Sequence, residues 1–350
     1  MPYYIRTSII IVNFNSWDKL KICLKSIYPT IQPNDEVIVV DNCSLANEIE
    51  KIRTNFPWVN TIKSTTNLGY GGGNNLGVKS AKGEYLVFLN PDTTVETGWL
   101  DPLISTLNSS SEIGLVTSKI LLMDNPNYIN TFGNDIHISG LTLCRGMGKD
   151  QSEYKSVKEV CAISGAAFMI RKNVFIDLGG FDEEFFMYME DADLSLRAQL
   201  AGWKCVTVPE SIVYHDYKLT FGPYKIFYQE RNRYLLLLKN FHLITLLLIS
   251  PSLLVAEIVT WGFVILQDRQ RCLNKINAYR WVIKNWQMVR IKKKACQKLR
   301  KVSDRHLFIK ESYKLDLEQT GKNIIIKTSK IIFDLIFLIF KFFTLIFLWW

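Results

Sequence analysis

The sequence lacks two features that would place the chain outside the cytoplasm. Its seven cysteines are scattered singly, with no Cys-x-x-Cys pair. An odd number of separated cysteines excludes a fully paired disulfide framework, so we expect reduced thiols. The first apolar run, residues 8–12, is too short for a secretory signal and precedes no small-residue cleavage site. We therefore expect residues 1–230 to stay in the cytoplasm.

Most of the chain also lacks excess positive charge, although its formal net charge is +9. Residues 267–330 contain 18 Lys plus Arg against 5 Asp plus Glu, a balance of +13, so the remainder carries −4. Such local basicity argues against nucleic acid as a partner. Next to apolar segments it predicts contact with an anionic membrane surface.

Two long apolar runs occupy the C-terminal third, residues 235–266 and residues 331–350. The first is long enough to span a bilayer and the second is marginal. One span through 235–266 would put the basic segment across the membrane from residues 1–230, against the positive-inside rule. The Ser250-Pro251 break predicts a re-entrant or interfacial helical pair instead. The alternatives are an ordinary span with residues 331–350 returning, or a buried core helix.

The N-terminal residues show a strand, helix, strand pattern. Residues 7–12 are a β-branched run ending in polar residues, residues 17–28 have helical spacing of apolar side chains, and residues 36–40 repeat the strand pattern. Parallel strands joined by a helix put their polar ends at one sheet edge, where ligands bind. We expect an α/β fold with a mostly parallel sheet flanked by helices. Asp41, at the second strand's end, can accept a hydrogen bond from a nucleobase imide N–H.

The densest glycine cluster spans residues 67–77 and precedes a helix expected to end near Lys82. Glycines there allow a ligand or another chain segment to approach the backbone, and exposed N–H groups favour an anion. The cluster lacks the Gly-Lys-Ser/Thr of a P-loop. A flexible surface turn is the alternative interpretation.

A possible half-site for a divalent cation follows the apolar strand at residues 85–89. Asn90-Pro91-Asp92 places a carboxylate and a carboxamide at the strand's end, although the tripeptide is also an ordinary turn. His215 could complete the site, while a lone histidine is more often structural.

Residues 121–154 show weak periodicity and predict an inserted hairpin or lid, to which we assign no chemistry. We expect His137 there to be a satisfied histidine. Residues 163–170 form a small-residue strand, suited to a place where substrate passes close to the backbone. Arg231 and Arg233 could approach a diphosphate, but we favour a solvated helix face.

Residues 190–195 carry three carboxylates within four positions, amid aromatic and apolar neighbours. Holding them charged together is costly, so we predict a helix start that carries a catalytic base. Asp193 and Arg197 can pair at i,i+4, and Gly202 can end the helix. An acidic first turn without chemistry is the alternative.

Over roughly its first 220 residues the chain resembles the inverting family 2 glycosyltransferases with the GT-A fold, in particular the rhamnosyltransferase-like members. The matching stretches occur in family order: Ser8–Asn15, Val39–Asn42, Asn67–Asn75, Leu89–Asp92, Ser164–Met169, Gly180–Glu183, Glu190–Leu194 and Tyr214–Asp216. The resemblance implies a GT-A domain over residues 1–230, with a nucleotide-binding half at 1–110 and an acceptor half at 111–230. Residues 231–350 would be a helical, basic, membrane-associated region.

The resemblance also implies roles for single residues. Asp191 matches the catalytic base with Glu190 beside it, Asp92 and His215 match the ligands of Mg²⁺ or Mn²⁺, and Gly165 lies by the sugars. Asn90 departs from the aspartate of many members, which should weaken metal affinity without abolishing it. The nucleotide-binding residues would be Asn13, Asn15, Asp41, Asn42, Asn67, Gly69, Asn75 and Asn90.

The implied activity moves a sugar from a nucleotide-diphospho-sugar to a hydroxyl of a glycan or lipid-linked glycan in surface polysaccharide synthesis, at the cytoplasmic face of the plasma membrane. Two alternatives are a polyprenyl-phosphate sugar synthase and a membrane-tethered pseudoenzyme that only binds nucleotide sugar. A processive synthase fits less well. Its Gln-x-x-Arg-Trp motif should precede the membrane segment, whereas the nearest match, residues 277–281, follows it and begins with Asn.

Overall fold

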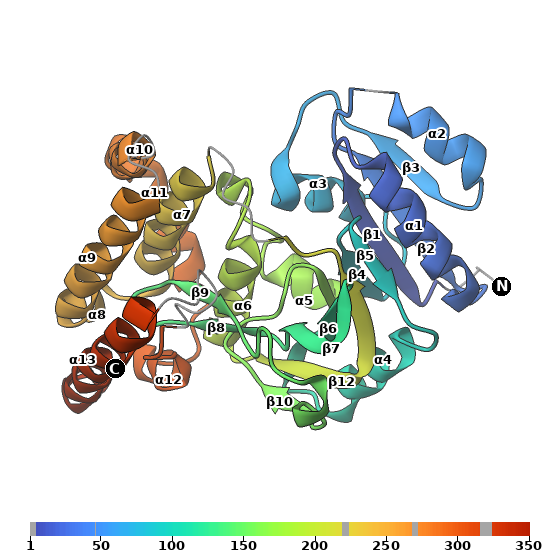
Figure 1. Cartoon of the computed structure of the whole chain (residues 1–350). Helices are drawn as coiled ribbons and strands as arrows, with labels where there is room; N and C mark the ends of the chain where they lie inside the picture. Colours follow the sequence, from blue (N-terminus) through green and yellow to red (C-terminus); the bar gives the residue numbers. More distant parts are fainter. Residues whose placement is uncertain (1–4, 46, 219–223, 268–271, 316–323) are drawn as a thin grey trace. The chain divides into compact units, whose positions relative to one another are not determined.

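The computed structural model describes residues 5–45, 47–218, 224–267, 272–315 and 324–350 (Figure 1). The chain divides into two compact units, each described here by itself. The first unit comprises residues 1–134, 144–198 and 203–218, and the second comprises residues 135–143, 199–202 and 219–350. The predicted boundary between residues 230 and 231 stays a prediction.

The first unit is built on a ten-stranded mixed sheet. Its main order is β10-β12-β6-β11-β4-β1-β2-β3, with β5 beside β12 and β7 beside β6. The bounds are β1 Thr7–Asn13, β2 Asp35–Asp41, β3 Asn60–Lys63, β4 Tyr85–Leu89, β5 Thr93–Val95, β6 Ile113–Leu122, β7 Asn125–Thr131, β10 Lys158–Glu159, β11 Ala167–Arg171 and β12 Lys204–His215. The α/β prediction is confirmed. The strands β3, β2, β1 and β4 are parallel, whereas β11 runs antiparallel between β4 and β6.

Helices cover this sheet because successive side chains of its buried strands point to opposite faces. Ile9 and Ile11 of β1 pack in one core with Leu20 and Leu24 of α1. Ile10 and Val12 of β1 face α3 instead. The helical elements of this unit are α1 Trp17–Ile27, η1 Tyr28–Thr30, α2 Glu48–Asn55, α3 Gly69–Val78, α4 Leu100–Ser109, η2 Gln151–Glu153, α5 Lys172–Asp177, η3 Glu183–Phe185 and α6 Glu190–Leu200, whose end is shared with the second unit.

The glycine cluster lies inside α3 rather than before it, and that helix ends at Val78, short of the predicted Lys82. A Cβ on Gly73 would lie 2.7 Å from Val12 Cγ1, and one on Gly77 would lie 2.6 Å from Ile10 Cγ2. The glycines therefore let α3 lie closely against β1. Of the two predicted reasons for the cluster, close approach of another chain segment is the one these contacts show.

The insertion after β6 contains the strand β7 and a two-stranded sheet of β8 (Asn134–Ile136) and β9 (Thr142–Cys144). This confirms an inserted hairpin. Its residue Asn134 also forms an isolated antiparallel bridge with Ala162, next to the start of β11. The predicted strand over residues 163–170 begins only at Ala167, so residues 163–166 form a turn instead.

The second unit is helical. The apolar stretch 235–266 is divided among three helices, with breaks at residues 241–242 and at Ile249. It is therefore not one long segment, and Pro251 lies in the first turn of α9, where proline is tolerated. Within the described ranges, no helix combines the length and apolar character needed to cross a membrane. The helices are α7 Lys225–Asn240, α8 Leu243–Leu248, α9 Ser250–Gln267, α10 Cys272–Lys284, α11 Trp286–Gln297, α12 Asp304–Lys310 and α13 Ile324–Phe347.

Candidate active site

The helix α6 begins at Glu190, as predicted, directly after a strained loop. Phe186, Tyr188 and Met189 have positive φ values of 58°, 69° and 67°. Left-handed backbone is unfavourable for such bulky residues and concentrates at functional sites. The loop is held from α3, because the Tyr70 backbone N–H donates to the Phe186 carbonyl at 2.7 Å. A Cβ on Gly69 would lie 2.1 Å from that carbonyl oxygen, so residue 69 must be glycine.

Asp191 is held by three hydrogen-bond donors. Its Oδ2 accepts from the Gly165 backbone N–H at 2.8 Å and from Asn134 Nδ2 at 3.3 Å, and its Oδ1 accepts from the Ala192 N–H at 2.8 Å. Glu190 beside it is buried, and its Oε2 has no hydrogen-bond partner within the described part of the chain. The two neighbouring acids therefore lie in unequal surroundings.

The surroundings decide which acid is charged. Burial, and then the charge of Asp191, raises the pKa of Glu190 to about 8. Burial also raises the pKa of Asp191, but the backbone N–H groups of Gly165 and Ala192 oppose that rise. Donors stabilise a carboxylate, so near pH 7 the proton resides on Glu190 and the negative charge on Asp191. Asp191 is then the acid able to accept a proton.

Asn134 is a site residue that the sequence did not reveal. Its Nδ2 lies 3.2 Å from the Ile163 carbonyl oxygen and 3.3 Å from the Asp191 carboxylate. Both neighbours only accept hydrogen bonds, so the amide must present its NH₂ group to them. The residue lies in the weakly periodic insertion, where no local pattern marks it.

Gly165 is placed directly against the acid pair. It donates its N–H to Asp191 and accepts, through its carbonyl, a hydrogen bond of 2.6 Å from the Tyr70 hydroxyl. Burial, followed by the charges of Glu190 and Asp191, raises the pKa of Tyr70 and keeps the phenol protonated. Gly165 therefore orients the base, and its predicted contact with sugars stays a prediction.

The predicted cation ligands Asp92 and His215 come together, because β5 pairs with β12 next to both residues. Asp92 Oδ1 lies 3.3 Å from His215 Nε2. His215 Nδ1 lies 2.9 Å from Asn130 Oδ1, which can only accept, so Nδ1 carries the hydrogen. His215 Nε2 therefore lies beside the Asp92 carboxylate, and both groups are metal ligands when Nε2 carries no hydrogen.

The charges around Asp92 keep its carboxylate ionised, as a metal ligand must be. Burial favours a higher pKa, but His215 and then Lys19 bring the pKa of Asp92 below its usual value. Lys19 Nζ lies 3.8 Å from Asp92 and 3.1 Å from Asp216. No group of three or more metal-ligating His, Cys, Asp or Glu side chains occurs in the described ranges. Any metal here would need further ligands, such as substrate oxygens or water.

Two unsatisfied acceptors lie at the ends of β1 and β2. Asn13 and Asp41 are register partners, and both are buried. Asn13 Nδ2 donates to Glu48 Oε2 at 2.7 Å, so the Oδ1 of the same Asn13 amide points away from Glu48. Asn13 Oδ1 and Asp41 Oδ2 have no hydrogen-bond partner among the residues that the structure describes. Buried acceptors of this kind call for a donor, and an imide N–H would supply one.

The other predicted nucleotide-binding residues make scaffold contacts. Asn42 Nδ2 donates to Asn67 Oδ1 at 3.0 Å, and Asn67 Oδ1 also accepts from the Gly69 N–H at 2.9 Å. Asn75 binds both backbone polar groups of Phe181, through hydrogen bonds of 2.9 and 3.0 Å. Their predicted contact with nucleotide stays a prediction.

Asn15 and Asn90 join loops at the same edge of the sheet. Asn15 Oδ1 accepts from the Leu45 N–H at 2.8 Å. The Asn90 N–H donates to the Ala166 carbonyl at 2.9 Å, and Leu89 pairs with Ala167 across β4 and β11. The loop carrying Asp92 therefore adjoins the turn beneath Asp191, so the acid pair and the candidate cation site share this edge.

Comparisons with known proteins give one family. Residues 8–179 match the model of glycosyl transferase family 2. A low-salt glycan biosynthesis hexosyltransferase of Haloferax volcanii is 30% identical over 202 residues, covering 55% of this chain and 61% of its own length. An N-acetylglucosaminyl-diphospho-decaprenol L-rhamnosyltransferase of Mycobacterium tuberculosis is 26% identical over 233 residues, covering 59% of this chain and 75% of its own. The chain thus spans about three fifths of the first relative's length.

Solved structures show the same fold. The structure of Staphylococcus aureus TarS residues 1–349 superposes with a TM-score of 0.55 at 16% identity, covering 89% of this chain and 85% of that one. The structure of GalNAc-T7 with UDP, GalNAc and Mn²⁺ gives a TM-score of 0.56 at 20% identity, covering 67% and 48%. At these identities the likeness shows the fold, which confirms the GT-A-like α/β prediction.

Proposed function

Residues 8–179 form a domain of glycosyl transferase family 2, and from that premise we propose that the chain moves a sugar from a nucleotide-diphospho-sugar to a hydroxyl group of a glycan or lipid-linked glycan. The observation that carries this proposal is the unequal acid pair at the start of α6. Asp191 is ionised and oriented by three donors, while Glu190 keeps its proton. A single oriented base is what hydroxyl activation requires.

In the proposed reaction Asp191 takes the proton of the acceptor hydroxyl. The freed oxygen attacks the anomeric carbon from the side opposite the diphosphate, and the bond from that carbon to the diphosphate oxygen breaks. One displacement inverts the anomeric centre, and the leaving nucleoside diphosphate takes the electron pair. Glu190 contributes by staying neutral, since a second negative charge would raise the proton affinity of Asp191 and hold the product proton there too tightly.

Asp92 and His215 would hold Mg²⁺ or Mn²⁺. Asp92 Oδ1 and His215 Nε2 lie 3.3 Å apart, and an oxygen and an imidazole nitrogen are suitable ligands for either ion. Such an ion, when bound, supplies positive charge that neutralises a departing diphosphate. Because no third His, Cys, Asp or Glu ligand joins Asp92 and His215 among the described residues, the site would rely on donor phosphate oxygens, so we expect metal and donor to bind together. The GalNAc-T7 structure, which shares the fold, contains Mn²⁺ and UDP.

The nucleoside end of the donor would lie at the ends of β1 and β2. There Asp41 Oδ2 and Asn13 Oδ1 would accept hydrogen bonds from the base, such as an imide N–H. Both oxygens are buried without partners in the described chain, so a bound base would relieve the desolvation that they suffer.

The name of one relative supports a lipid-linked acceptor. The mycobacterial relative is named for a decaprenol-linked acceptor. We propose that this chain likewise builds envelope polysaccharide at the cytoplasmic face of the plasma membrane. Its second unit would rest on an anionic lipid surface, close to a lipid-linked acceptor.

The test is donor turnover by the purified full-length chain. A panel of uridine, thymidine and guanosine diphospho-sugars is screened by thermal shift, and any stabilising donor is assayed for hydrolysis and transfer. Chelation by EDTA should abolish turnover, and added Mn²⁺ should restore it. Binding of a donor without any turnover, in the presence of Mn²⁺ and lipid-linked acceptors, would contradict the proposal and favour the pseudoenzyme.

A further inference from the structure

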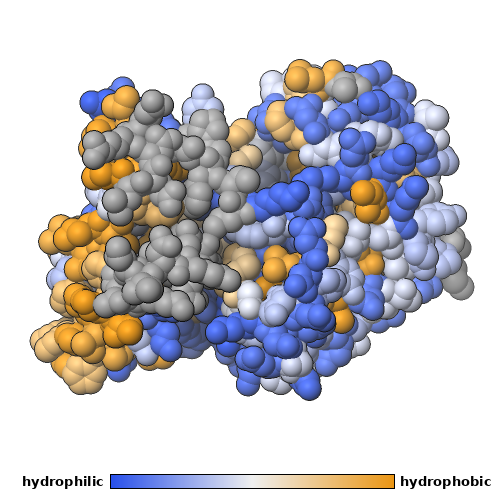
Figure 2. Space-filling view, in the orientation of Figure 1, coloured by the Kyte–Doolittle hydropathy of each residue, from blue (hydrophilic) through white to orange (hydrophobic). Residues whose placement is uncertain are grey.

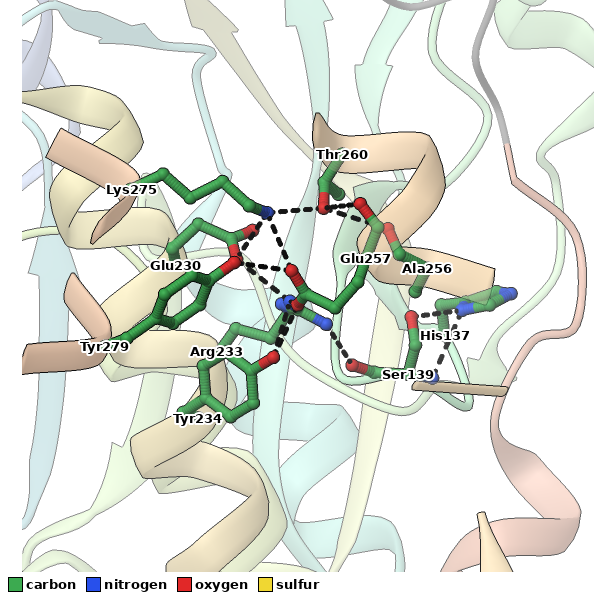
Figure 3. Close-up of polar contacts among 10 residues, drawn as sticks. All are labelled: His137, Ser139, Glu230, Arg233, Tyr234, Ala256, Glu257, Thr260, Lys275 and Tyr279. Atoms are coloured by element: carbon green, nitrogen blue, oxygen red, sulfur yellow. Dashed lines mark hydrogen bonds and ion pairs between the residues drawn. The ribbon is translucent and has the colours of Figure 1, made fainter. Parts of the chain in front are cut away.

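The helix α9 turns its one acidic side chain into the protein. Figure 3 shows Glu257 among cationic and phenolic groups from α7 and α10. It pairs with Arg233 and Tyr234 of α7, and its Oε2 lies 3.2 Å from Lys275 Nζ of α10. Burial would raise the pKa of Glu257, but the charge of Arg233 and these hydrogen bonds bring it down to about 2. Glu257 is therefore ionised and anchors α9 inward.

The cluster around Glu257 balances its own charge. Arg233 and Lys275 are both fully buried, and Glu230 faces both of them, at 2.9 Å from each. Two cations and two carboxylates thus meet in the interior of the second unit. The solvated face predicted for Arg231 and Arg233 is wrong, because both side chains are buried. Arg233 pairs with Glu230, three residues before it, and with the distant Glu257. Paired charges of this kind tolerate burial.

One stripe of α9, next to Glu257, is apolar and exposed. Leu254 is 65% exposed, Ile258 61% and Ile265 44%. Their spacing of four and seven residues puts them on one helical stripe, away from the buried Ser252 and Ala256. A surface helix of a soluble protein has the reverse arrangement, with the apolar side inward and the charged side in water.

The helix α13 is inverted in the same way. Its Lys341 donates to the Ile309 carbonyl at 2.9 Å and to the Glu311 carbonyl, and its Asp334 accepts from the Leu315 N–H at 2.8 Å. Its inward stripe also contains the buried Phe337. Its outward stripe consists of Ile331, Ile332, Leu335, Leu338, Ile339, Phe342, Phe343, Ile346 and Phe347, each at least 41% exposed.

These stripes make one apolar surface, which we call the α9–α13 face. The helices α9 and α13 contact each other. Figure 2 shows hydrophobic residues gathered over α8, α9 and α13 on the visible side of this unit. Scattered exposed apolar residues need no explanation, but a contiguous patch of this kind marks an interaction site. Exposed basic residues lie on α10 and α11, and α10 contacts α9; they include Lys284, Arg290 and Lys294.

We propose that the α9–α13 face docks flat on a bilayer of anionic lipids, with its apolar stripes among the acyl chains and the basic residues of α10 and α11 toward the headgroups. This inference rests on the proposed function and specifies which residues of the second unit contact the lipid and which side of each helix faces it. A lipid surface fits better than a second copy of the chain, because the exposed basic residues of α10, which contacts α9, would repel their counterparts in a symmetric dimer. The inward ionic anchors of both helices fix which side meets lipid.

The experiment is flotation of the purified full-length chain with vesicles. Vesicles of phosphatidylglycerol and phosphatidylethanolamine should bind the protein, and neutral phosphatidylcholine vesicles should bind it more weakly. The double variant Leu338→Glu/Phe342→Glu should bind anionic vesicles at least about tenfold more weakly, since two exposed apolar side chains are replaced by charges. Both positions are exposed, so folding should survive. The matched control is Ile22→Glu, which alters a 56% exposed side chain on α1 of the first unit and should bind as the wild type does.

Three outcomes would overturn the docking face. They are a wild-type chain that does not float with anionic vesicles, a double variant that floats equally well, and a dimer that the double variant converts to monomer without any change in vesicle binding. Vesicle binding is measured without donor. A chain that binds vesicles but turns over no donor would therefore refute the proposed enzymatic function while supporting the face.

Discussion

The two units bury carboxylates in opposite settings. In the first, Glu190 and Asp191 are neighbours in the sequence, and burial together with like charge raises the pKa of Glu190 to about 8. In the second, Glu257 is also partly buried, yet Arg233 and the surrounding donors bring its pKa down to about 2. The first arrangement leaves a proton equilibrium near neutral pH, as chemistry requires. The second removes any such equilibrium and holds three helices together.

The largest expected effect concerns the Glu190–Asp191 pair of the first unit. Asp191→Asn should lower transfer at least about 100-fold, because an amide cannot accept the hydroxyl proton. Donor binding, measured by calorimetry, should stay within a few-fold of wild type. Asp177→Asn, which changes an exposed acid of α5, is the control and should leave the rate unchanged. Residual activity above about a hundredth of wild type would show that another group is the base.

The next largest effect concerns the buried cluster around Glu257 in the second unit. Lys275→Met replaces a buried cation with an uncharged side chain of similar length. The negative charges of Glu230 and Glu257 then lack one of their two cations, which should cost about 3–5 kcal/mol of unfolding free energy. Urea unfolding followed by circular dichroism measures the loss. Lys284→Met, at an exposed position of the same helix, should cost little. If both variants were equally stable, the buried cluster would not hold the helices together.

The smallest effect is a change in pH dependence. In the unfolded chain Glu190 has the ordinary glutamate pKa of 4.5, whereas burial and then the charge of Asp191 raise its pKa in the folded chain to about 8. The folded state therefore binds more protons in this window, and the stability that Glu190 contributes falls as pH rises through it. Glu190→Gln cannot titrate and should lose less stability than wild type between pH 5 and pH 8.

Urea midpoints at the two pH values measure that difference, with Glu153→Gln, at an exposed position, as the control. The same slope in wild type and Glu190→Gln would mean that Glu190 titrates normally. Like Glu257, Glu190 would then have no proton equilibrium near neutral pH.

Local patterns in the sequence predict much of the first unit. The β-branched run from Thr7 gives β1, and the acidic turn at Glu190 gives the start of α6, because each depends on residues close in the chain. The meeting of Asp92 and His215 was predicted from residues at the ends of separate strands and also implied by the family resemblance, and the structure brings them together where β5 pairs with β12.

Other features depend on contacts that the sequence does not display. Asn134 reaches Asp191 across 57 positions, and Arg233 reaches Glu257 across 24, so neither has a local signature. The apolar run at residues 235–266 was predicted to break at Ser250-Pro251, whereas the structure breaks it at residues 241–242 and at Ile249, because hydropathy does not record where helices end. The solvated face expected for Arg233 failed for the same reason, since burial depended on partners elsewhere.

The contact between Tyr70 and Phe186 ties the start of α3 to the strained loop that precedes Asp191. With residue 69 limited to glycine, the two segments have little freedom to move separately. A movement of α3 would therefore shift the loop as well. If the proposed reaction holds, a donor that moved α3 would also move Asp191.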